Sequence, residues 1–154
     1  MVFLMFNCFE PQVVFQEVPN EVSLAFLVTG CPFACDGCHS QDSWTATSGV
    51  ELDAKTFSNY LSQYKNLITC VVFFGGEWQA HKLIAHLKFA KNQGLKTCLY
   101  TGAEKVSNSI IAHLDFLKTG RWQKQLGGLN NKNTNQRFIN VTTKTLLNYK
   151  FLGN

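Results

Sequence analysis

The stretch VSLAFLVTGCPFACDGCHSQDSW (residues 22–44) joins a continuous apolar run to a loop that holds three cysteines. The run Val22–Val28 has the length and character of a strand that is buried on both faces, as in a parallel sheet. Cys31, Cys35 and Cys38 follow directly, with the spacing C-x3-C-x2-C. Since thiolates bind zinc and iron–sulfur clusters, the stretch predicts a metal site at the end of a buried strand.

Beyond this loop, helical and strand patterns alternate along the chain. A helix is expected at residues 52–66, where Asp53 is the N-cap, and a second at 81–94, where Gly94 ends the helix. A third, shorter helix is expected around 104–112. Strands are expected at 69–74, 96–102 and 114–120. This alternation predicts an α/β fold of βαβ units with right-handed crossovers and a parallel sheet. The segments that follow the strands should then meet at one edge of the sheet.

Length and composition favour a single domain spanning residues 1–154. Within it we expect an N-terminal extension or hairpin at 1–20, with an edge strand or hairpin at 12–18, and a basic C-terminal loop and strand region at 121–154. No apolar run approaches the ~18–20 residues that span a bilayer, and the N-terminus does not resemble a signal peptide. We therefore expect a cytoplasmic protein without a membrane partner, whose clustered cysteines serve metal binding or catalysis rather than disulfides.

Charge is distributed unevenly along the chain. The formal net charge is +4, yet no acidic residue follows Asp115, which leaves +7 after that residue and −3 for the chain up to and including it. The basic residues of this last part are Lys118, Arg121, Lys124, Lys132, Arg137, Lys144 and Lys150. Two interpretations stay open: a docking surface for an acidic or phosphate-bearing partner, and an ordinary solvated surface. Because no nucleic-acid motif frames these residues, no nucleic-acid partner is expected.

Several kinds of site could use the three cysteines. A structural zinc site needs a fourth ligand, but His39 is adjacent to Cys38, and Cys70 falls in a predicted buried strand, as does Cys98. The sequence CDGCH also matches a haem-attachment pattern that belongs to exported proteins. A thioredoxin-like C-x-x-C site would leave Cys31 without a role. The remaining interpretation is a [4Fe–4S] cluster with one iron left open for a ligand.

A second motif, FFGGEW (residues 73–78), stands at the end of the next predicted strand. Two glycines there allow the backbone to approach a ligand closely, although they could equally form a plain strand-to-helix turn. Together the two motifs resemble those of radical S-adenosylmethionine enzymes. The resemblance implies a partial, open TIM-like barrel of βα units, in which the methionyl amino and carboxylate groups of S-adenosylmethionine chelate the open iron.

The resemblance also assigns roles to individual residues. It implies that Gly75, Gly76 and Glu77 bind the methionyl amino group. We count Thr101 and Gly102 among the cofactor-binding residues as well, although they could equally form a simple turn. Members of the superfamily often have an aromatic residue before the third cysteine, where this chain has Gly37. We count Gly37 and His39 among the cofactor-binding residues, with Phe33 and Trp44 as further residues that could pack near the adenine.

The segments TGCPFACDGCHSQDSW, FFGGEW, YTG, LDFLKTGRW and TNQRF occur in the order seen in activating proteins of anaerobic ribonucleoside-triphosphate reductase (class III ribonucleotide reductase activases). The similarity runs over residues 22–140. It implies that a 5′-deoxyadenosyl radical, formed with one electron from a flavodoxin- or ferredoxin-type donor, removes a hydrogen from a glycine of the reductase. Lys118 and Arg137 could meet the cofactor's carboxylate or the partner, and Asn135 and Gln136 could organise a loop.

Three alternatives remain open. The chain could activate another glycyl-radical enzyme of the pyruvate formate-lyase type, or act on a small molecule as 7-carboxy-7-deazaguanine synthases do. It could also be a non-catalytic iron–sulfur or zinc module. The short chain favours an open barrel that accepts a protein substrate, because an enclosed small-molecule pocket needs more residues.

Overall fold

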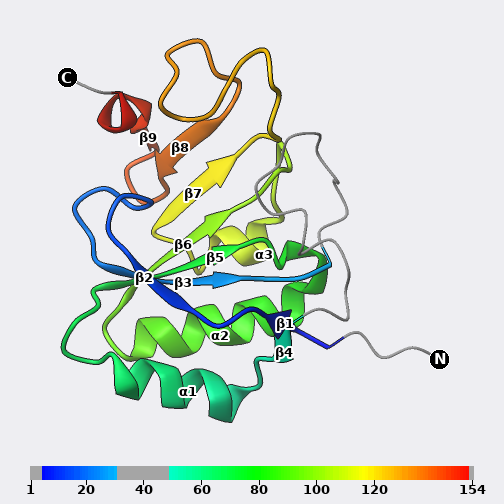
Figure 1. Cartoon of the computed structure of the whole chain (residues 1–154), viewed down its shortest axis with the longest axis vertical. Helices are drawn as coiled ribbons and strands as arrows, with labels where there is room; N and C mark the ends of the chain where they lie inside the picture. Colours follow the sequence, from blue (N-terminus) through cyan, green and yellow to red (C-terminus); the bar gives the residue numbers. More distant parts are fainter. Residues whose placement is uncertain (1–4, 31–48, 153–154) are drawn as a thin grey trace.

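In the computed structural model, which describes residues 5–30 and 49–152, seven strands form one mixed sheet with the order β2-β3-β5-β6-β7-β8-β9 (Figure 1). The strands are β2 (Gln12–Val14), β3 (Ser23–Leu27), β5 (Cys70–Phe74), β6 (Lys96–Tyr100), β7 (Phe116–Thr119), β8 (Arg137–Asn140) and β9 (Thr145–Leu146). A separate antiparallel pair joins β1 (Asn7–Cys8) to β4 (Val50–Glu51). The helices are α1 (Ala54–Gln63), α2 (Ala80–Asn92) and α3 (Asn108–Ile111), with short 3₁₀ helices η2 (Glu77–Gln79) and η3 (Asn148–Phe151).

The centre of the sheet is parallel, as the alternation of strands and helices predicts. β3, β5, β6 and β7 pair in parallel, and their register places Phe26, Phe73, Leu99 and Leu117 in one row across the sheet. Helices follow β5 and β6 in the chain as crossovers. This regular register brings the carboxyl ends of the parallel strands to a common edge, toward the right of Figure 1.

The outer strands are antiparallel. β2 is an edge strand that pairs with β3, in agreement with the expected strand or hairpin at 12–18. At the other side, β8 pairs antiparallel with β7, and β9 with β8. The α/β class is thus confirmed as a mixed sheet, while the finer expectation of a partial TIM-like barrel remains a prediction.

The two faces of the sheet carry separate cores. Alternate side chains of β3 and β5 point to opposite faces because a strand has a period of two. One set packs beneath α1 and α2, which lie along one face in Figure 1. The core on this face also takes in residues of the two helices and of the segment before β1, and its fully buried side chains include Phe6, Phe26, Phe57, Phe73, Leu83 and Leu87. The other face buries Ala25, Val72, Cys98, Phe116 and Phe138, with Phe151 of η3 packed against them.

The helix ends follow local chemistry. Asp53 caps α1, because its Oδ1 accepts a hydrogen bond from the Thr56 amide at 2.8 Å. Gly94 follows α2 with φ +81°, the left-handed conformation that closes many helices. The helix expected at 104–112 is shorter in the structure, where only α3 is helical. The carbonyl of Ala103 accepts a hydrogen bond from the Gly120 amide at 2.9 Å and is therefore used outside a helix. Within the described parts of the chain, no helix is long and apolar enough to cross a membrane.

Candidate functional site

The segments after β5, β6 and β7 lie side by side, as the parallel sheet predicts. The Gly75 amide donates to Tyr100 O at 2.8 Å, and the Thr101 amide donates to Lys118 O at 2.9 Å. These bonds continue the parallel ladder just beyond the strand ends. Residues 75–77, 101–102 and 118–120 are thereby brought to one edge of the sheet, where the sequence places the cofactor site.

The two glycines after β5 form a turn that other residues would strain. Gly75 has φ +86° and Gly76 has φ +106°, in the region that favours glycine. A Cβ added at Gly76 would lie 3.0 Å from Phe6 Cζ, and one added at Gly75 would lie 2.6 Å from Trp78 Cη2. The turn is therefore packed tightly on two aromatic rings, and it starts η2 with Glu77 as the first residue.

Glu77 is partly buried, and the two oxygens of its carboxylate differ in their hydrogen bonding. Its Oε1 accepts a hydrogen bond from Thr101 Oγ1, whereas Oε2 is buried and has no hydrogen-bond partner among the described residues. Burial raises the pKa of Glu77, and the Thr101 hydrogen bond and the charge of Lys118 oppose that rise. Because a buried acceptor without a donor is costly, Oε2 is suited to a cationic or N–H ligand.

Thr101 is fixed from two sides. Its hydroxyl oxygen accepts from the Ala103 amide at 3.0 Å, so the single hydroxyl proton is available for Glu77. The side chain is buried. Thr101 therefore orients the Glu77 carboxylate, and the neighbouring Gly102 lies in the same loop.

Lys118 is a buried lysine, only 8% exposed. Its Nζ donates to Gly120 O at 2.8 Å and to Thr101 O at 3.3 Å, and it lies 5.8 Å from the centroid of the Tyr100 ring. The expectation that it meets a cofactor carboxylate or a partner stays a prediction. What the structure shows is a cation that ties together the loops after β6 and β7.

The segment before β8 is organised by side-chain hydrogen bonds, as the sequence predicts. Asn135 Nδ2 donates to Arg121 O at 3.1 Å, and Gln136 Nε2 donates to Gly120 O at 3.4 Å. Arg137, the first residue of β8, is exposed. The loop after β7 is thus held against the end of β8, next to Lys118.

The three cysteines and two predicted cofactor-binding residues lie outside the described residues: Cys31, Cys35, Cys38, Gly37 and His39. The same holds for Phe33 and Trp44. The described chain after β3 runs to Gly30, and the Val28 amide donates to Phe74 O at 3.0 Å. The chain therefore leaves β3 toward the cysteines at the same edge that holds Glu77.

The other three cysteines are buried packing residues with free thiols. Burial raises the pKa of Cys8 and of Cys70 to about 12, and it raises that of Cys98 well above its ordinary value. Such thiols are poor ligands and poor nucleophiles at neutral pH. In residues 5–30 and 49–152, no cluster of three His, Cys, Asp or Glu residues could hold a metal ion.

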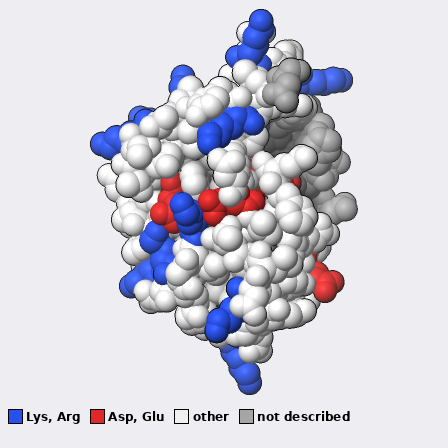
Figure 2. Space-filling model, turned by 90° about the vertical axis from the view of Figure 1, so that its left-hand side faces the viewer, with Lys and Arg blue, Asp and Glu red and all other residues white. Residues whose placement is uncertain are grey.

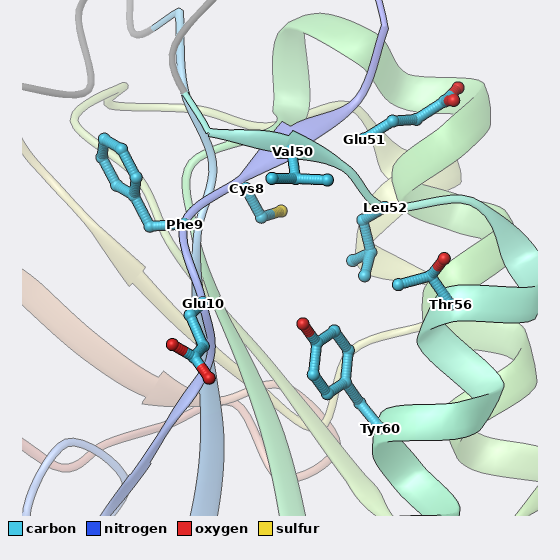
Figure 3. Close-up of a pocket in the computed structure, with 8 residues that line it drawn as sticks. All are labelled: Cys8, Phe9, Glu10, Val50, Glu51, Leu52, Thr56 and Tyr60. Atoms are coloured by element: carbon cyan, nitrogen blue, oxygen red, sulfur yellow. The ribbon is translucent and has the colours of Figure 1, made fainter.

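A pocket of about 250 Å³ lies between β1, β4 and α1 (Figure 3). Cys8, Leu52 and Tyr60 point into it, while the carboxylates of Glu10 and Glu51 lie at its rim and point away. None of the residues that line it belongs to the group around Glu77. The pocket is therefore separate from the candidate cofactor site.

A family model described as "4Fe-4S single cluster domain" matches residues 21–139, which is most of the chain. The chain belongs to this family. No curated protein matches it. Among solved structures, the crystal structure of QueE from Escherichia coli is similar, with a TM-score of 0.53 and 16% sequence identity. The aligned region covers 68% of this chain and 56% of QueE, so the chain spans little more than half of that protein's length.

Membership of the 4Fe-4S single cluster family and the shared fold agree with the coarser part of the sequence prediction. The family model implies a [4Fe–4S] cluster as cofactor, and the likeness to QueE is one of fold. The described residues fit an amine-bearing ligand, because a buried carboxylate oxygen without a donor, Oε2 of Glu77, lies at the edge where β3, β5 and β6 end.

The sequence analysis names Lys118 as a residue that could meet the cofactor or the partner, but it does not predict that this lysine is buried. The alternation of side chains along β7 contains the signal. Lys118 shares a face with Phe116, and the register sets it opposite Tyr100 of β6. A residue two positions from a buried phenylalanine in a central strand points into the same core.

Proposed function

We propose that this 4Fe-4S single cluster protein is a radical S-adenosylmethionine enzyme that activates anaerobic ribonucleoside-triphosphate reductase by forming a glycyl radical on it. The family and the fold support the superfamily. The order of the motifs from residue 22 to residue 140 supports the activase branch. The electron donor would be a protein of the flavodoxin or ferredoxin type.

The observation that carries the proposal is the open oxygen of Glu77. A buried carboxylate oxygen without a donor attracts a cationic amine, since a charge-assisted hydrogen bond would satisfy it. The methionyl amino group of S-adenosylmethionine is such an amine. Thr101 holds the other carboxylate oxygen, so Oε2 keeps a fixed position for the ligand.

Cys31, Cys35 and Cys38 would hold three irons of the cluster, and Glu77 would bind the amino group of S-adenosylmethionine. When bound, the two cofactors supply a one-electron reductive cleavage that yields methionine and, after a hydrogen is taken from a glycine of the partner, 5′-deoxyadenosine and a glycyl radical. Lys118 ties the Thr101 and Gly120 carbonyls together, and its charge favours the ionised form of Glu77. The burial of Glu77 Oε2 keeps water away from this oxygen.

A protein substrate is favoured by the open sheet. Within the described residues, the edge strands β2 and β9 do not pair with each other, so the sheet does not close. An open sheet leaves room for a polypeptide loop to approach the carboxyl ends of the parallel strands. This supports a large substrate over an enclosed small molecule.

The proposal is tested by reconstituting the protein anaerobically and adding dithionite and S-adenosylmethionine. We expect 5′-deoxyadenosine by chromatography. Glu77→Gln should weaken S-adenosylmethionine binding roughly 10- to 100-fold, as expected for a lost hydrogen bond to a charged group. Glu104→Gln makes the same chemical change at an exposed position and should bind like the wild type.

Two outcomes would favour the alternatives. A protein that takes up a cluster but never cleaves S-adenosylmethionine would be a non-catalytic iron–sulfur electron-transfer module. A protein that cleaves it, yet forms a glycyl radical only on a partner of the pyruvate formate-lyase type, would be an activase of that other enzyme.

A further inference from the structure

The C-terminal edge of the sheet is exposed, basic and free of acidic residues. This basic edge comprises the loop after β7, then β8, β9 and η3 (residues 121–152). Its exposed cations are Arg121, Lys124, Lys132, Arg137, Lys144 and Lys150. No aspartate or glutamate follows Asp115 in the sequence, so the segment carries no carboxylate side chain of its own to neutralise them.

Most of these cations have no ion pair within residues 5–30 and 49–152. The five cations without one are Lys124, Lys132, Arg137, Lys144 and Lys150. By contrast, Lys91 pairs with Asp115 at 3.0 Å and Lys96 with Glu21 at 4.0 Å. In Figure 2, whose upper part corresponds to the upper part of Figure 1, basic side chains project at the top and the acidic ones are confined to the middle and lower parts of this face. The basic edge is therefore an uncompensated positive surface.

Apolar side chains are exposed among the cations. Leu146 is 44% exposed, Tyr149 63% and Leu152 38%. Leu152 lines two hollows of about 590 Å³ each, one with Lys150 and the other with Lys132 and Trp122. Exposed apolar and aromatic groups beside unpaired charges are typical of protein interfaces rather than of plain solvated surface.

The basic edge is connected to the candidate site. It begins at Arg121, directly after Gly120, whose carbonyl accepts from both Lys118 and Gln136. The start of the basic edge therefore adjoins the loops near Glu77, whereas the hollow beside Lys150 is lined by Gln16, Pro19 and Asn20, which precede β3.

We propose that the basic edge is the docking surface for an acidic, partly apolar segment of the protein substrate. This inference rests on the proposed function, because it places the partner of that reaction. A protein is favoured over a nucleic acid, since leucines lie between the cations and a phosphate backbone would leave them uncovered.

The test compares two charge-reversal variants with the same change in net charge. Lys132→Glu/Lys150→Glu alters the two hollows beside Leu152, and Lys65→Glu/Lys88→Glu alters exposed positions outside the basic edge. Binding of each reconstituted protein to anaerobic ribonucleoside-triphosphate reductase is measured by calorimetry at about 20 mM and about 300 mM salt. We expect the first variant to bind roughly tenfold more weakly at low salt, with a smaller difference at high salt, and the control to change less than about twofold.

The outcomes separate this inference from the proposed function. S-adenosylmethionine cleavage without the reductase should be the same in all three proteins. Equal binding of the reductase by wild type and the Lys132/Lys150 variant would overturn the docking surface and leave the function standing. A wild type that neither binds the reductase nor forms a glycyl radical on it would overturn both. Salt-dependent self-association, or tight binding of a DNA or RNA duplex, that is lost only in the Lys132/Lys150 variant would show that the surface serves another occupant.

Discussion

Substitution of Gly76 by alanine tests the packing of the turn that presents Glu77. Gly76 has φ +106° and ψ −9°, a conformation that costs an L-residue about 1–2 kcal/mol. The new Cβ would also lie 3.0 Å from Phe6 Cζ and 3.3 Å from Val28 Cγ2. Both neighbours are only 1% exposed and cannot move into solvent.

The magnitude follows from adding these effects. Overpacking a buried site costs about 1–3 kcal/mol. In the opposite direction, alanine restricts the unfolded chain more than glycine does, which stabilises the folded protein by about 0.4–1 kcal/mol. We therefore expect Gly76→Ala to lower the free energy of unfolding by about 1–5 kcal/mol, with the middle of the range near 3 kcal/mol. Gly94→Ala is the matched control, because Gly94 has φ +81° but no atom within 4 Å of an added Cβ. It should cost about 1 kcal/mol or less.

The assay is urea unfolding followed by circular dichroism, with both variants and the wild type prepared in the same way. The difference between the two variants isolates the steric contact with Phe6. A Phe6→Leu background should reduce that difference, since it removes the ring atoms nearest to Gly76. Equal destabilisation by Gly76→Ala and Gly94→Ala would refute the close packing of this turn.

Further predictions concern the site and the pH dependence of stability. Thr101→Val should weaken S-adenosylmethionine binding by calorimetry, because Glu77 loses the donor that fixes it, whereas Thr101→Ser should bind like the wild type; equal binding by both variants would show that the hydroxyl does not position Glu77. Burial lowers the pKa of His86, so on acidification this histidine takes up a proton in the unfolded chain before it does so in the folded protein. The stability present above a pH of about 6.5 should therefore be lost as the pH falls. The free energy of unfolding of His86→Phe, measured from pH 5 to 7.5, should depend less on pH than that of the wild type, and an unchanged slope would contradict this. Hydrogen bonds from Thr56 lower the pKa of Asp53, so the stabilisation by this N-cap is present above the pKa of the unfolded chain and is lost on acidification. Asp53→Ala should destabilise the protein at neutral pH but not at low pH. A difference in stability between Asp53→Ala and the wild type that persists in acid would count against the cap. Cys98→Ala should retain the visible absorbance of the reconstituted cluster, whereas Cys35→Ala should lose it; the reverse result would exclude the assigned ligands.

The parts of the fold that depend on local periodicity were predictable. Continuous apolar runs identified β3 and β5, and the helical spacing with Asp53 and Gly94 identified α1 and α2. The neighbourhood of Glu77 and Thr101 was predictable as well, because parallel strands end at one edge whatever their exact bounds. These features need only short stretches of sequence.

Features that depend on distant pairing were not predictable. β1 and β4 are two residues each, and they pair Asn7 with Glu51 across the chain, so no periodic pattern reveals them. α3 is shorter than the sequence indicates because the carbonyl of Ala103 bonds to the Gly120 amide. The alternation along β7 sets Lys118 on the face of Phe116, but the two carbonyls that accept from its Nζ belong to different loops, and a sequence pattern does not display them.

The central claim is that this 4Fe-4S single cluster protein forms a glycyl radical on a protein partner. The most direct measurement is electron paramagnetic resonance of the reconstituted protein mixed with anaerobic ribonucleoside-triphosphate reductase, S-adenosylmethionine and a reductant. The account predicts a glycyl radical signal that is absent without S-adenosylmethionine and strongly reduced with Glu77→Gln. A reduced, cluster-loaded protein that cleaves S-adenosylmethionine but gives no glycyl radical with the reductase would contradict it.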